Sequence, residues 1–509
     1  MMEEENVLTN ETPAEQPQDP NLKRKAFSST FWKFLERIIA QGVTLIVSII
    51  IARILDPEDY SVISVVLIFF NFANVFISGG FNTALIQKKD SDSLDYSSVL
   101  WVTLGISVVI YLALFFTAPY IAILFDKEVL TIVIRIMGLT LPIAGIKSIW
   151  TAYISQTLNF KKFFFATIGG TAVSAVVGIW MALAGYGVWA LVAQQMVNTA
   201  IDTIILIVTT RIHIRLTVSM PRIKVLFKYG WKVFVSSLVN TAYGESTSFI
   251  IGIRYEAADL SYYTKGKRFP DTICSSLTST FSAVLFPVLA KVQDNKEKVL
   301  HYTRMFMRLC SFVLFPAMLG FLALADTFVM VLLTEKWMGA VFYIQLFCVC
   351  CMFDVVAVGN CESIKAIGRS GVFLIMEIIK KTLYLGIIIA FVFLSPSAEI
   401  MAVSAAACVL VQILVNSIPN VKLINYKVRY QIWDLLPNLL MSVIMAGAVW
   451  GFGYLNKQFM HINLIVVLIL QLLIGVVLYL GMSILTRNKS YIYLKDTAVK
   501  FIKGRRHHE

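Results

Sequence analysis

The sequence predicts an all-α integral membrane protein with about fourteen transmembrane helices, arranged as two pseudo-symmetric six-helix lobes plus two C-terminal helices. Three observations predict this class. Apolar residues make up 58% of the 509 residues and charged residues only 15%, whereas soluble chains carry roughly 25% charged residues. Apolar runs recur along the whole chain, and a bilayer is crossed by ~20 such residues. The segment 50–61 also recurs at 250–261.

The first two predicted spans are joined by a short acidic turn, residues 56–60. Each span carries polar residues that share one helix face. These two polar stripes are Arg37, Gln41, Thr44 and Ser48 on the first span, and Asn71, Asn74, Ser78 and Asn82 on the second. Because hydrocarbon cannot satisfy amides and charges, we expect both stripes to face protein or water.

Short connections link the predicted spans and leave no room for a soluble domain between them. The spans cover residues 27–54, 60–81, 96–118, 130–157, 163–183, 188–210, 225–252, 260–290, 299–324, 339–364, 372–394, 399–421, 433–454 and 463–486. The predicted domains are a disordered cytoplasmic tail (1–25), an N-lobe (26–210), a basic cytoplasmic linker (211–224), a C-lobe (225–425), the last two spans (432–486) and a basic cytoplasmic tail (487–509).

Lysine and arginine are distributed unevenly between the two sides of these spans. One set of connections holds the basic clusters, among them residues 88–89, 161–162 and 211–228. The alternate connections hold only Lys127, Arg254, Lys336 and Lys457. Since cytoplasmic connections carry the excess of positive charge, we predict that both termini are cytoplasmic. The net charge of +13 is then explained as an insertion signal and does not indicate nucleic-acid binding.

The internal repeat supports the division into two lobes. Four of twelve positions are identical between 50–61 and 250–261, and both segments form the outside turn after the first span of a lobe. Because each lobe has an even number of spans, both lobes start on the same side, and their symmetry axis runs along the membrane normal. Internal repeats of this kind are typical of transporters.

No motif in the sequence indicates catalysis or a metal centre. Cys348, Cys350 and Cys351 lack a nearby histidine or CxxC pair, so we interpret them as small buried hydrophobic residues. No HExxH, P-loop or GxSxG motif occurs. The sequence therefore predicts a protein that is not an enzyme and that holds no metal or organic cofactor.

Several short motifs, taken in order, resemble the polysaccharide (O-antigen type) flippases of the multidrug/oligosaccharidyl-lipid/polysaccharide exporter superfamily. They are ARILDPEDYSV (52–62), GGFNTALIQKKD (79–90), NFKK (159–162), GYGVWALV (185–192), the segment 263–270 and LFPVLAKVQD (285–294). Asp56 and Ser61 depart from this pattern, because glycine is expected at both positions.

The resemblance implies both a function and a location. Such flippases are thought to move undecaprenyl-pyrophosphate-linked oligosaccharides across the bacterial cytoplasmic (inner) membrane by alternating access, for the biosynthesis of surface polysaccharides such as lipopolysaccharide. The implied partners are the lipid-linked oligosaccharide, membrane lipids and a polysaccharide polymerase or chain-length regulator. We expect a monomer, with Na⁺ or H⁺ as the candidate coupling ion.

Ionisable side chains inside the spans carry the strongest functional signal, because a charge at the bilayer centre costs about 2.5–3.5 kcal/mol. A pyrophosphate passing between the lobes needs cationic partners. The predicted cations are Arg37, Arg135, Lys147, Lys232 and Arg268, and the predicted polar lining is Gln41, Asn71, Asn74 and Asn240. The candidates for ion coupling are Glu245, Asp354 and Glu362, with pairing of Glu362 to Lys365 as the alternative for that residue.

Other charges inside the spans have simpler explanations. Glu377 is expected to pair with Lys381 at a spacing of i, i+4. Four arginines near span ends are expected to reach the lipid headgroups. They are Arg53, Arg254, Arg304 and Arg308.

Two other functions fit parts of the sequence. A cation-coupled drug antiporter of the same superfamily would favour an acidic cavity and usually has fewer spans. A membrane glycan polymerase or glycosyltransferase would need a sizeable outside loop with catalytic residues, which this chain lacks. A structural scaffold would leave the charges inside the spans unexplained.

Overall fold

The computed structural model describes residues 20–88 and 91–496, which contain helices and no β-strand. The helices are α1 (Pro20–Ile54), α2 (Pro57–Ser78), α3 (Phe81–Gln87), α4 (Ser93–Leu124), α5 (Val129–Gly138), α6 (Thr140–Thr157), α7 (Phe160–Leu183), α8 (Val188–Thr209), α9 (Met220–Arg254), α10 (Ala257–Lys291), α11 (Lys296–Leu332), α12 (Ala340–Met352), α13 (Asp354–Ala366), α14 (Ser370–Leu394), α15 (Ala398–Leu423), α16 (Val428–Leu455) and α17 (Leu464–Leu485). Two short helical turns, η1 (Glu335–Trp337) and η2 (Asn456–Met460), and a C-terminal helix that starts at Lys489 accompany them.

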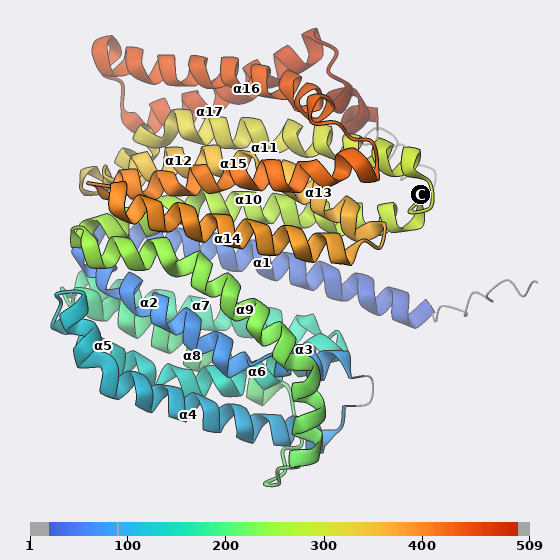
Figure 1. Cartoon of the computed structure of the whole chain (residues 1–509). Coiled ribbons are helices and arrows are strands. Elements are labelled where there is room, and N and C mark those ends of the chain that lie inside the picture. Colours follow the sequence, from blue (N-terminus) through green and yellow to red (C-terminus); the bar gives the residue numbers. More distant parts are fainter. Residues whose placement is uncertain (1–19, 89–90, 497–509) are drawn as a thin grey trace, which may run out of the picture.

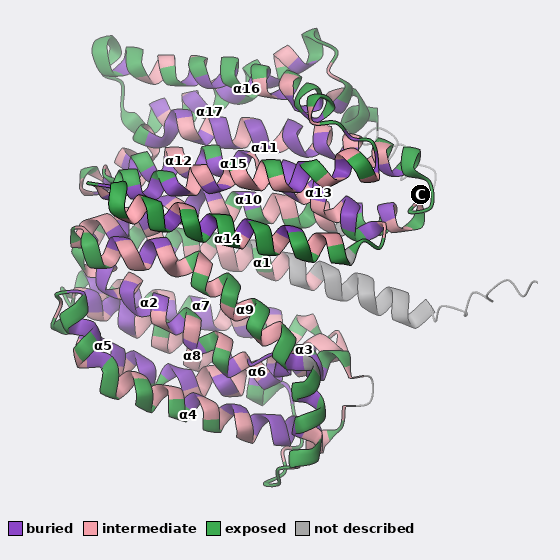
Figure 2. Ribbon diagram, in the orientation of Figure 1, coloured by how far each residue is buried: buried purple, intermediate pink, exposed green. Residues whose placement is uncertain are grey.

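In Figure 1 the long helices run side by side, with α4 at one edge of the bundle and α16 and α17 at the opposite edge. Residues 1–19 of the predicted N-terminal tail and residues 497–509 of the basic C-terminal tail lie outside the described residues. Exposed residues follow the outer faces of α4, α14 and α16 (Figure 2). Large apolar side chains are exposed there, such as Phe116 and Ile444, as expected for helices that contact lipid.

The all-helical membrane class predicted from the sequence is confirmed. Within the described residues, twelve helical segments are long and apolar enough to cross a bilayer. The two remaining predicted spans, 225–252 and 372–394, correspond to α9 and α14. These helices are also long, with 35 and 25 residues; α9 is more polar, and the otherwise apolar α14 carries the three charged residues Glu377, Lys380 and Lys381. The two sets together agree with the predicted number of about fourteen spans.

Helix α9 repeats the bounds of α1 with a shift of 200 residues, and α10 begins 200 residues after the start of α2. Both α1 and α9 contain 35 residues, and α2 and α10 begin at Pro57 and Ala257. Two residues related by the same shift lie in contact, because Ser64 Oγ is 3.1 Å from Thr264 Oγ1. Helix α9 nevertheless packs along α2 and α3, which belong to the first half of the sequence (Figure 1). The boundaries of the two lobes stay a prediction.

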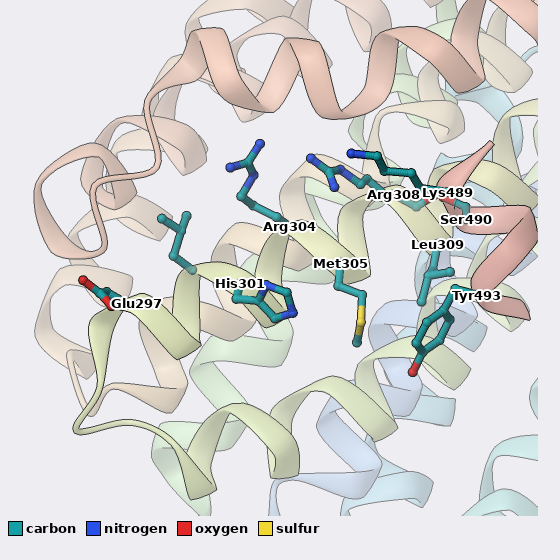
Figure 3. Close-up of a pocket in the computed structure, with 10 residues that line it drawn as sticks. Glu297, His301, Arg304, Met305, Arg308, Leu309, Lys489, Ser490 and Tyr493 are labelled. Atoms are coloured by element: carbon teal, nitrogen blue, oxygen red, sulfur yellow. Dashed lines mark hydrogen bonds between the residues drawn. The ribbon is translucent and has the colours of Figure 1, made fainter. Parts of the chain in front are cut away.

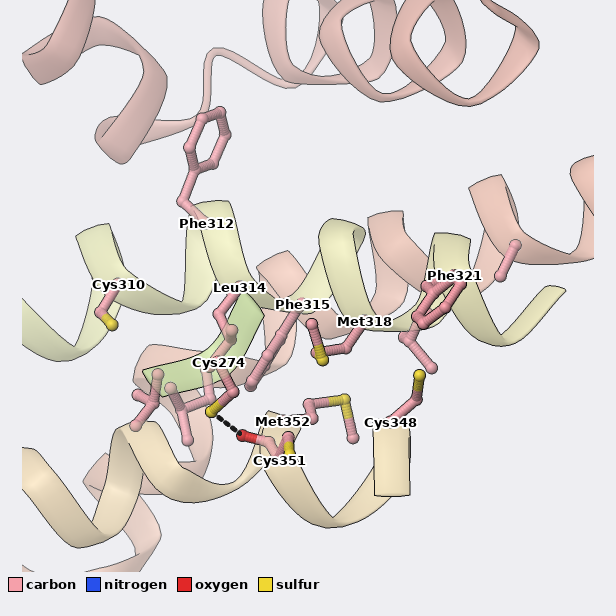
Figure 4. Packing of buried hydrophobic residues seen from close by; sticks show 14 of the residues in the cluster. Cys274, Cys310, Phe312, Leu314, Phe315, Met318, Phe321, Cys348, Cys351 and Met352 are labelled. Atoms are coloured by element: carbon pink, nitrogen blue, oxygen red, sulfur yellow. Dashed lines mark hydrogen bonds between the residues drawn. The ribbon is translucent and has the colours of Figure 1, made fainter. Parts of the chain in front are cut away.

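Cysteine and methionine side chains contribute to the largest hydrophobic core, which lies around α10, α11 and α12. Figure 4 shows this part of the core, where Cys274, Met318 and Met352 lie near Phe315. Six of the seven cysteines are buried, and all seven are free thiols. Their burial agrees with the interpretation of these residues as small hydrophobic side chains.

The second predicted span, 60–81, ends close to the end of α2, where two glycines lie. Gly79 and Gly80 separate α2 from α3, and their φ angles of +48° and +73° favour glycine. Gly80 also packs on the backbone of α9, because a Cβ atom added to it would lie 2.0 Å from the carbonyl oxygen of Gly230. The glycine pair therefore allows α3 to approach α9 closely.

We expect Gly80→Ala to lower the midpoint of thermal unfolding in detergent, by an amount equivalent to roughly 1–3 kcal/mol, since it strains the backbone and separates α3 from α9. Gly105→Ala is the control. Gly105 lies within α4 with no atom within 4 Å of an added Cβ, so alanine there should stabilise by about 0.4–1 kcal/mol. Equal shifts for both variants would contradict the proposed contact.

Arg304 and Arg308, which were expected to reach the lipid headgroups, also pair with a carboxylate that the sequence did not indicate. Both guanidinium groups bind Asp434 in α16: Arg304 Nε lies 2.7 Å from Oδ2, and Arg308 Nε lies 2.9 Å from Oδ1. The Tyr426 hydroxyl donates to the same carboxylate at 2.8 Å. Asp434 is buried, and a buried carboxylate requires such partners. The two arginines fasten α11 to α16, and Tyr426 binds the same carboxylate from the loop before α16.

Asp434→Asn should lower the thermal unfolding midpoint of the full-length protein, because it leaves two cations without their counter-charge. The expected cost is on the order of 2 kcal/mol, below the roughly 3–5 kcal/mol of fully buried pairs, since Arg304 and Arg308 are about one-third exposed. Asp294→Asn removes an exposed carboxylate and should leave the midpoint unchanged. A similar midpoint for both variants would contradict this role of Asp434.

Candidate functional site

The polar stripe of α1, which was predicted to face protein or water, contacts α10. Arg37 Nη1 donates to Ser279 Oγ at 3.3 Å, and the Ser276 hydroxyl donates to Gln41 Oε1 at 3.4 Å. Further along, Lys265 Nζ donates to Ser48 Oγ at 2.7 Å. Each partner lies on α10, so the first helix of the chain satisfies its polar groups against the second half of the sequence.

The polar stripe of α2 faces α9. Asn71 Nδ2 donates to Glu245 Oε1 at 2.8 Å across this contact. On its other side α9 faces α14, because the rings of Tyr243 and Tyr384 are stacked with centroids 4.9 Å apart. Lys381 lies over the Tyr243 ring at 4.4 Å. Helix α9 is therefore polar on two sides, and each side meets a different half of the molecule.

Eight of the twelve predicted site residues lie on α1, α2, α9 and α10. We call this set the central polar cluster: Arg37, Gln41, Asn71, Asn74, Lys232, Asn240, Glu245 and Arg268. Arg37, Lys232 and Arg268 are exposed. Within the described residues none of these three cations forms an ion pair with a carboxylate. Their charge thus remains available to an anionic ligand.

Two predicted cations lie elsewhere. Lys147 forms an ion pair with the buried carboxylate of Asp202 in α8. Arg135 donates to the carbonyl oxygen of Phe115 at 3.2 Å and lies 4.4 Å from the centroid of its ring. Both contacts stay within the helices of the first half, so the structure does not bring these residues to the central polar cluster.

The predicted acidic residues of α13 also have local partners. Glu362 binds Lys365 at 3.0 Å, which is the alternative named for that residue. Asp354 accepts a hydrogen bond from Gln412 Nε2 at 3.1 Å. In α14 the expected pairing of Glu377 with Lys381 was wrong. Glu377 pairs with Lys380 at 2.5 Å, while Lys381 contacts α9.

Two thiols and two carboxylates meet between α10 and the α12–α13 junction. Possible ligand atoms of Cys274, Cys351 and Asp354 lie within 4.8 Å of one another, a set that could hold a metal ion. The thiols also satisfy the acids directly, with Cys274 Sγ 3.4 Å from Asp354 and Cys351 Sγ 3.4 Å from Asp271. The sequence analysis missed this group. The sequence does contain a signal for it, because an aspartate and a cysteine lie three residues apart twice, at Asp271 and Cys274 and at Cys351 and Asp354.

Contacts between the two halves also join the turns that the charge distribution places outside. Trp337 Nε1 donates to the carbonyl oxygen of Ala52 at 2.7 Å, and Lys336 Nζ lies 3.2 Å from Asp56 Oδ1. The Ser261 hydroxyl donates to the carbonyl oxygen of Pro57 at 2.5 Å. Sequence reasoning did not identify Trp337, because no periodic pattern surrounds the η1 turn. These contacts join the two halves at the ends that the sequence predicts to lie outside.

Lys127 lies in the loop before α5 and donates to the hydroxyl of Ser61 in α2. Burial lowers the pKa of Lys127 to about 8, although the nearby Glu58 carboxylate acts in the opposite direction. The charged form of Lys127 is therefore less favourable in the folded protein than in the unfolded chain, although it still predominates at pH 7.

This lysine should make stability rise with pH. In the folded protein it loses its proton near pH 8, and the unfolded chain holds that proton up to its ordinary pKa of about 10.5. Between these values the unfolded state binds more protons, so folding becomes more favourable as pH increases. The thermal midpoint of the wild type, relative to Lys127→Gln, should increase from about pH 8 to about pH 10.5. Parallel profiles for the two proteins would contradict the lowered pKa.

The sequence and the fold both match known membrane proteins. Residues 50–342 match the family model described as "Polysaccharide biosynthesis protein". The succinoglycan biosynthesis transport protein ExoT of Rhizobium meliloti is 25% identical over 306 residues, which are 60% of this chain and 62% of that protein. The lipopolysaccharide biosynthesis protein WzxC of Escherichia coli is 23% identical over 340 residues, 65% of this chain and 67% of that protein. The match therefore spans less than two thirds of the ExoT protein.

Solved structures share the fold at low sequence identity. The lipid II flippase MurJ in an inward closed conformation has a TM-score of 0.72 and 16% identity, and the match covers 91% of this chain and 99% of that one. An inward-facing multidrug resistance transporter of the MATE family has a TM-score of 0.58 and 14% identity, with 77% and 99% covered. At these identities the likeness concerns the fold alone.

Proposed function

Because the chain belongs to the polysaccharide biosynthesis protein family, we propose that it is a flippase for undecaprenyl-pyrophosphate-linked oligosaccharides in the bacterial cytoplasmic membrane. One observation carries this proposal. The central polar cluster presents the exposed cations Arg37, Lys232 and Arg268 on helices from both halves of the chain. A pyrophosphate is an anion that such a set would bind.

The residues of the cluster suit different parts of this substrate. The guanidinium groups of Arg37 and Arg268 offer planar pairs of donors to phosphate oxygens, and Lys232 adds a point charge. The amides of Asn71, Asn74 and Asn240 offer donors and acceptors to sugar hydroxyls. The polyprenyl chain remains in the lipid, where it needs no polar partner.

Transport in this proposal proceeds by alternating access. The contacts of Trp337, Lys336 and Ser261 at the outside turns close the outer route, and release of the headgroup outside requires that they separate. Glu245 bonds Asn71 between α9 and α2, so protonation or Na⁺ binding at this carboxylate would change a contact between the halves. This geometry makes Glu245 the strongest of the three candidates for ion coupling, and Asp354 stays a second candidate.

The proposal includes the orientation and partners predicted from the sequence. Both termini lie in the cytoplasm, since the basic connections lie on that side. The protein works as a monomer beside a polysaccharide polymerase or chain-length regulator. Drug antiport by the same fold is less well supported, because a cluster with unpaired cations would repel a cationic drug.

The test is translocation of a fluorescent polyprenyl-pyrophosphate oligosaccharide in vesicles that contain the purified protein. Arg37→Gln and Lys232→Gln should each reduce the rate roughly 10- to 100-fold, the effect of losing a charge-assisted hydrogen bond worth about 1.5–3 kcal/mol. Lys224→Gln is the matched control for Lys232→Gln, because Lys224 is an exposed lysine on the same helix but outside the cluster.

Unchanged transport by both cluster variants would reject the assigned binding site. If the wild type fails to move the glycolipid but exports a cationic drug, the flippase proposal itself is wrong. For ion coupling, Glu245→Gln should remove the dependence of the rate on a pH or Na⁺ gradient while retaining substrate binding.

A further inference from the structure

A cavity of about 440 Å³ lies between α11 and the C-terminal helix that starts at Lys489. Figure 3 shows Arg304, Arg308 and Lys489 along one side of this cavity, with their charged groups extending in the same general direction. Glu297 also lines the cavity, but it lies at the far end from Lys489. None of the residues of the central polar cluster lines it, so this pocket is separate from the proposed substrate site.

The pocket carries an excess of positive charge. Arg304 and Arg308 share the single carboxylate of Asp434, which neutralises only one of the two guanidinium groups. Their side chains are 33% and 34% exposed, so part of each remains open to a ligand. Lys489 is exposed, and no carboxylate in the described part of the chain pairs with it. Three cations thus face one buried acid at this end of the cavity.

The lining is apolar as well as basic. Leu300, Met305 and Leu309 also line the pocket, from the same helix as the two arginines. The charge distribution of the sequence places the start of α11 and the C-terminal helix on the cytoplasmic side. Basic pockets between helices at that level suit anionic lipid headgroups, and an apolar wall beside the cations suits the acyl chains of the same molecule.

We propose that this pocket binds the phosphate headgroup of an anionic membrane phospholipid. The phosphate lies between Lys489 and the guanidinium groups of Arg304 and Arg308, where charge-assisted hydrogen bonds are strong. The acyl chains lie against Leu300, Met305 and Leu309. A lipid held in this way joins the C-terminal helix to α11, and it therefore acts on the stability of this edge of the bundle and not on transport chemistry.

The experiment uses the full-length protein in detergent with phosphatidylglycerol or phosphatidylcholine of identical acyl chains, and native mass spectrometry counts the bound lipid. Phosphatidylglycerol should bind about tenfold more tightly than phosphatidylcholine to the wild type. Lys489→Gln should reduce the phosphatidylglycerol affinity about tenfold. Lys495→Gln, an exposed lysine of the same helix that does not line the pocket, should leave it unchanged.

Competition with inorganic phosphate tests whether the pocket binds the phosphate of a lipid headgroup or a free phosphate ion. If phosphate at millimolar concentration displaces phosphatidylglycerol completely and binds with the same dependence on Lys489, the site takes a free anion and the lipid assignment is overturned. Equal binding of the two lipids by the wild type also overturns it, without any variant. An equal loss of affinity in Lys489→Gln and Lys495→Gln would reject the pocket as the site.

Discussion

Hydrocarbon offers no hydrogen-bond partner, so each polar side chain within these helices must be satisfied inside the bundle or by water. This constraint determines which helices meet. Asp202 is buried in α8 and binds Lys147 of α6, and Asp434 is buried in α16 and binds two arginines of α11. Each pair fastens two helices that are far apart in sequence. An isolated polar residue in a span therefore selects the helix that carries its partner. Apolar side chains then pack around the ion pair.

Helix α9 shows how the same constraint links the two halves of the molecule. Its sequence belongs to the second half, yet one polar side bonds α2 through Glu245 and the other side meets α14 through Tyr243. At Gly80 and Gly230 the two backbones approach so closely that Gly80 has no room for a side chain, and a Cβ atom at Gly230 would lie only 3.0 Å from the backbone of Gly80. When the halves move relative to each other, α9 must either move together with α2 and lose its contact with α14, or move with α14 and lose its contact with α2. The close contact of Gly80 with Gly230 favours movement of α9 together with α2, because α9 packs more closely on α2 and α3 than on α14.

The sequence allowed the membrane class, most spans and the direction of the polar stripes to be predicted, because periodicity states which face of a helix is polar. It does not state which helix that face will meet. Lys147 was therefore expected in the cavity, although its partner Asp202 lies 55 residues further along the chain. The carboxylate partner of Arg304 and Arg308 was missed for the same reason, since it is more than a hundred residues away. The close approach of α3 to α9 depends on a tertiary contact at Gly80, so hydrophobicity alone did not predict it.

The cations within the bundle can be divided by their partners into those paired with a carboxylate and those still able to bind an anionic ligand. Lys147, Arg304 and Arg308 each face a carboxylate that cancels at least part of their charge. Arg37 instead bonds a serine hydroxyl, which orients the guanidinium group but leaves its charge intact. Within the described residues Lys232 and Arg268 likewise have no carboxylate partner. A hydroxyl partner is a better choice than an acid wherever an anionic ligand has to arrive and leave, because the ligand then need not displace an existing ion pair. By this criterion α1, α9 and α10 carry the cations that can serve a mobile anion.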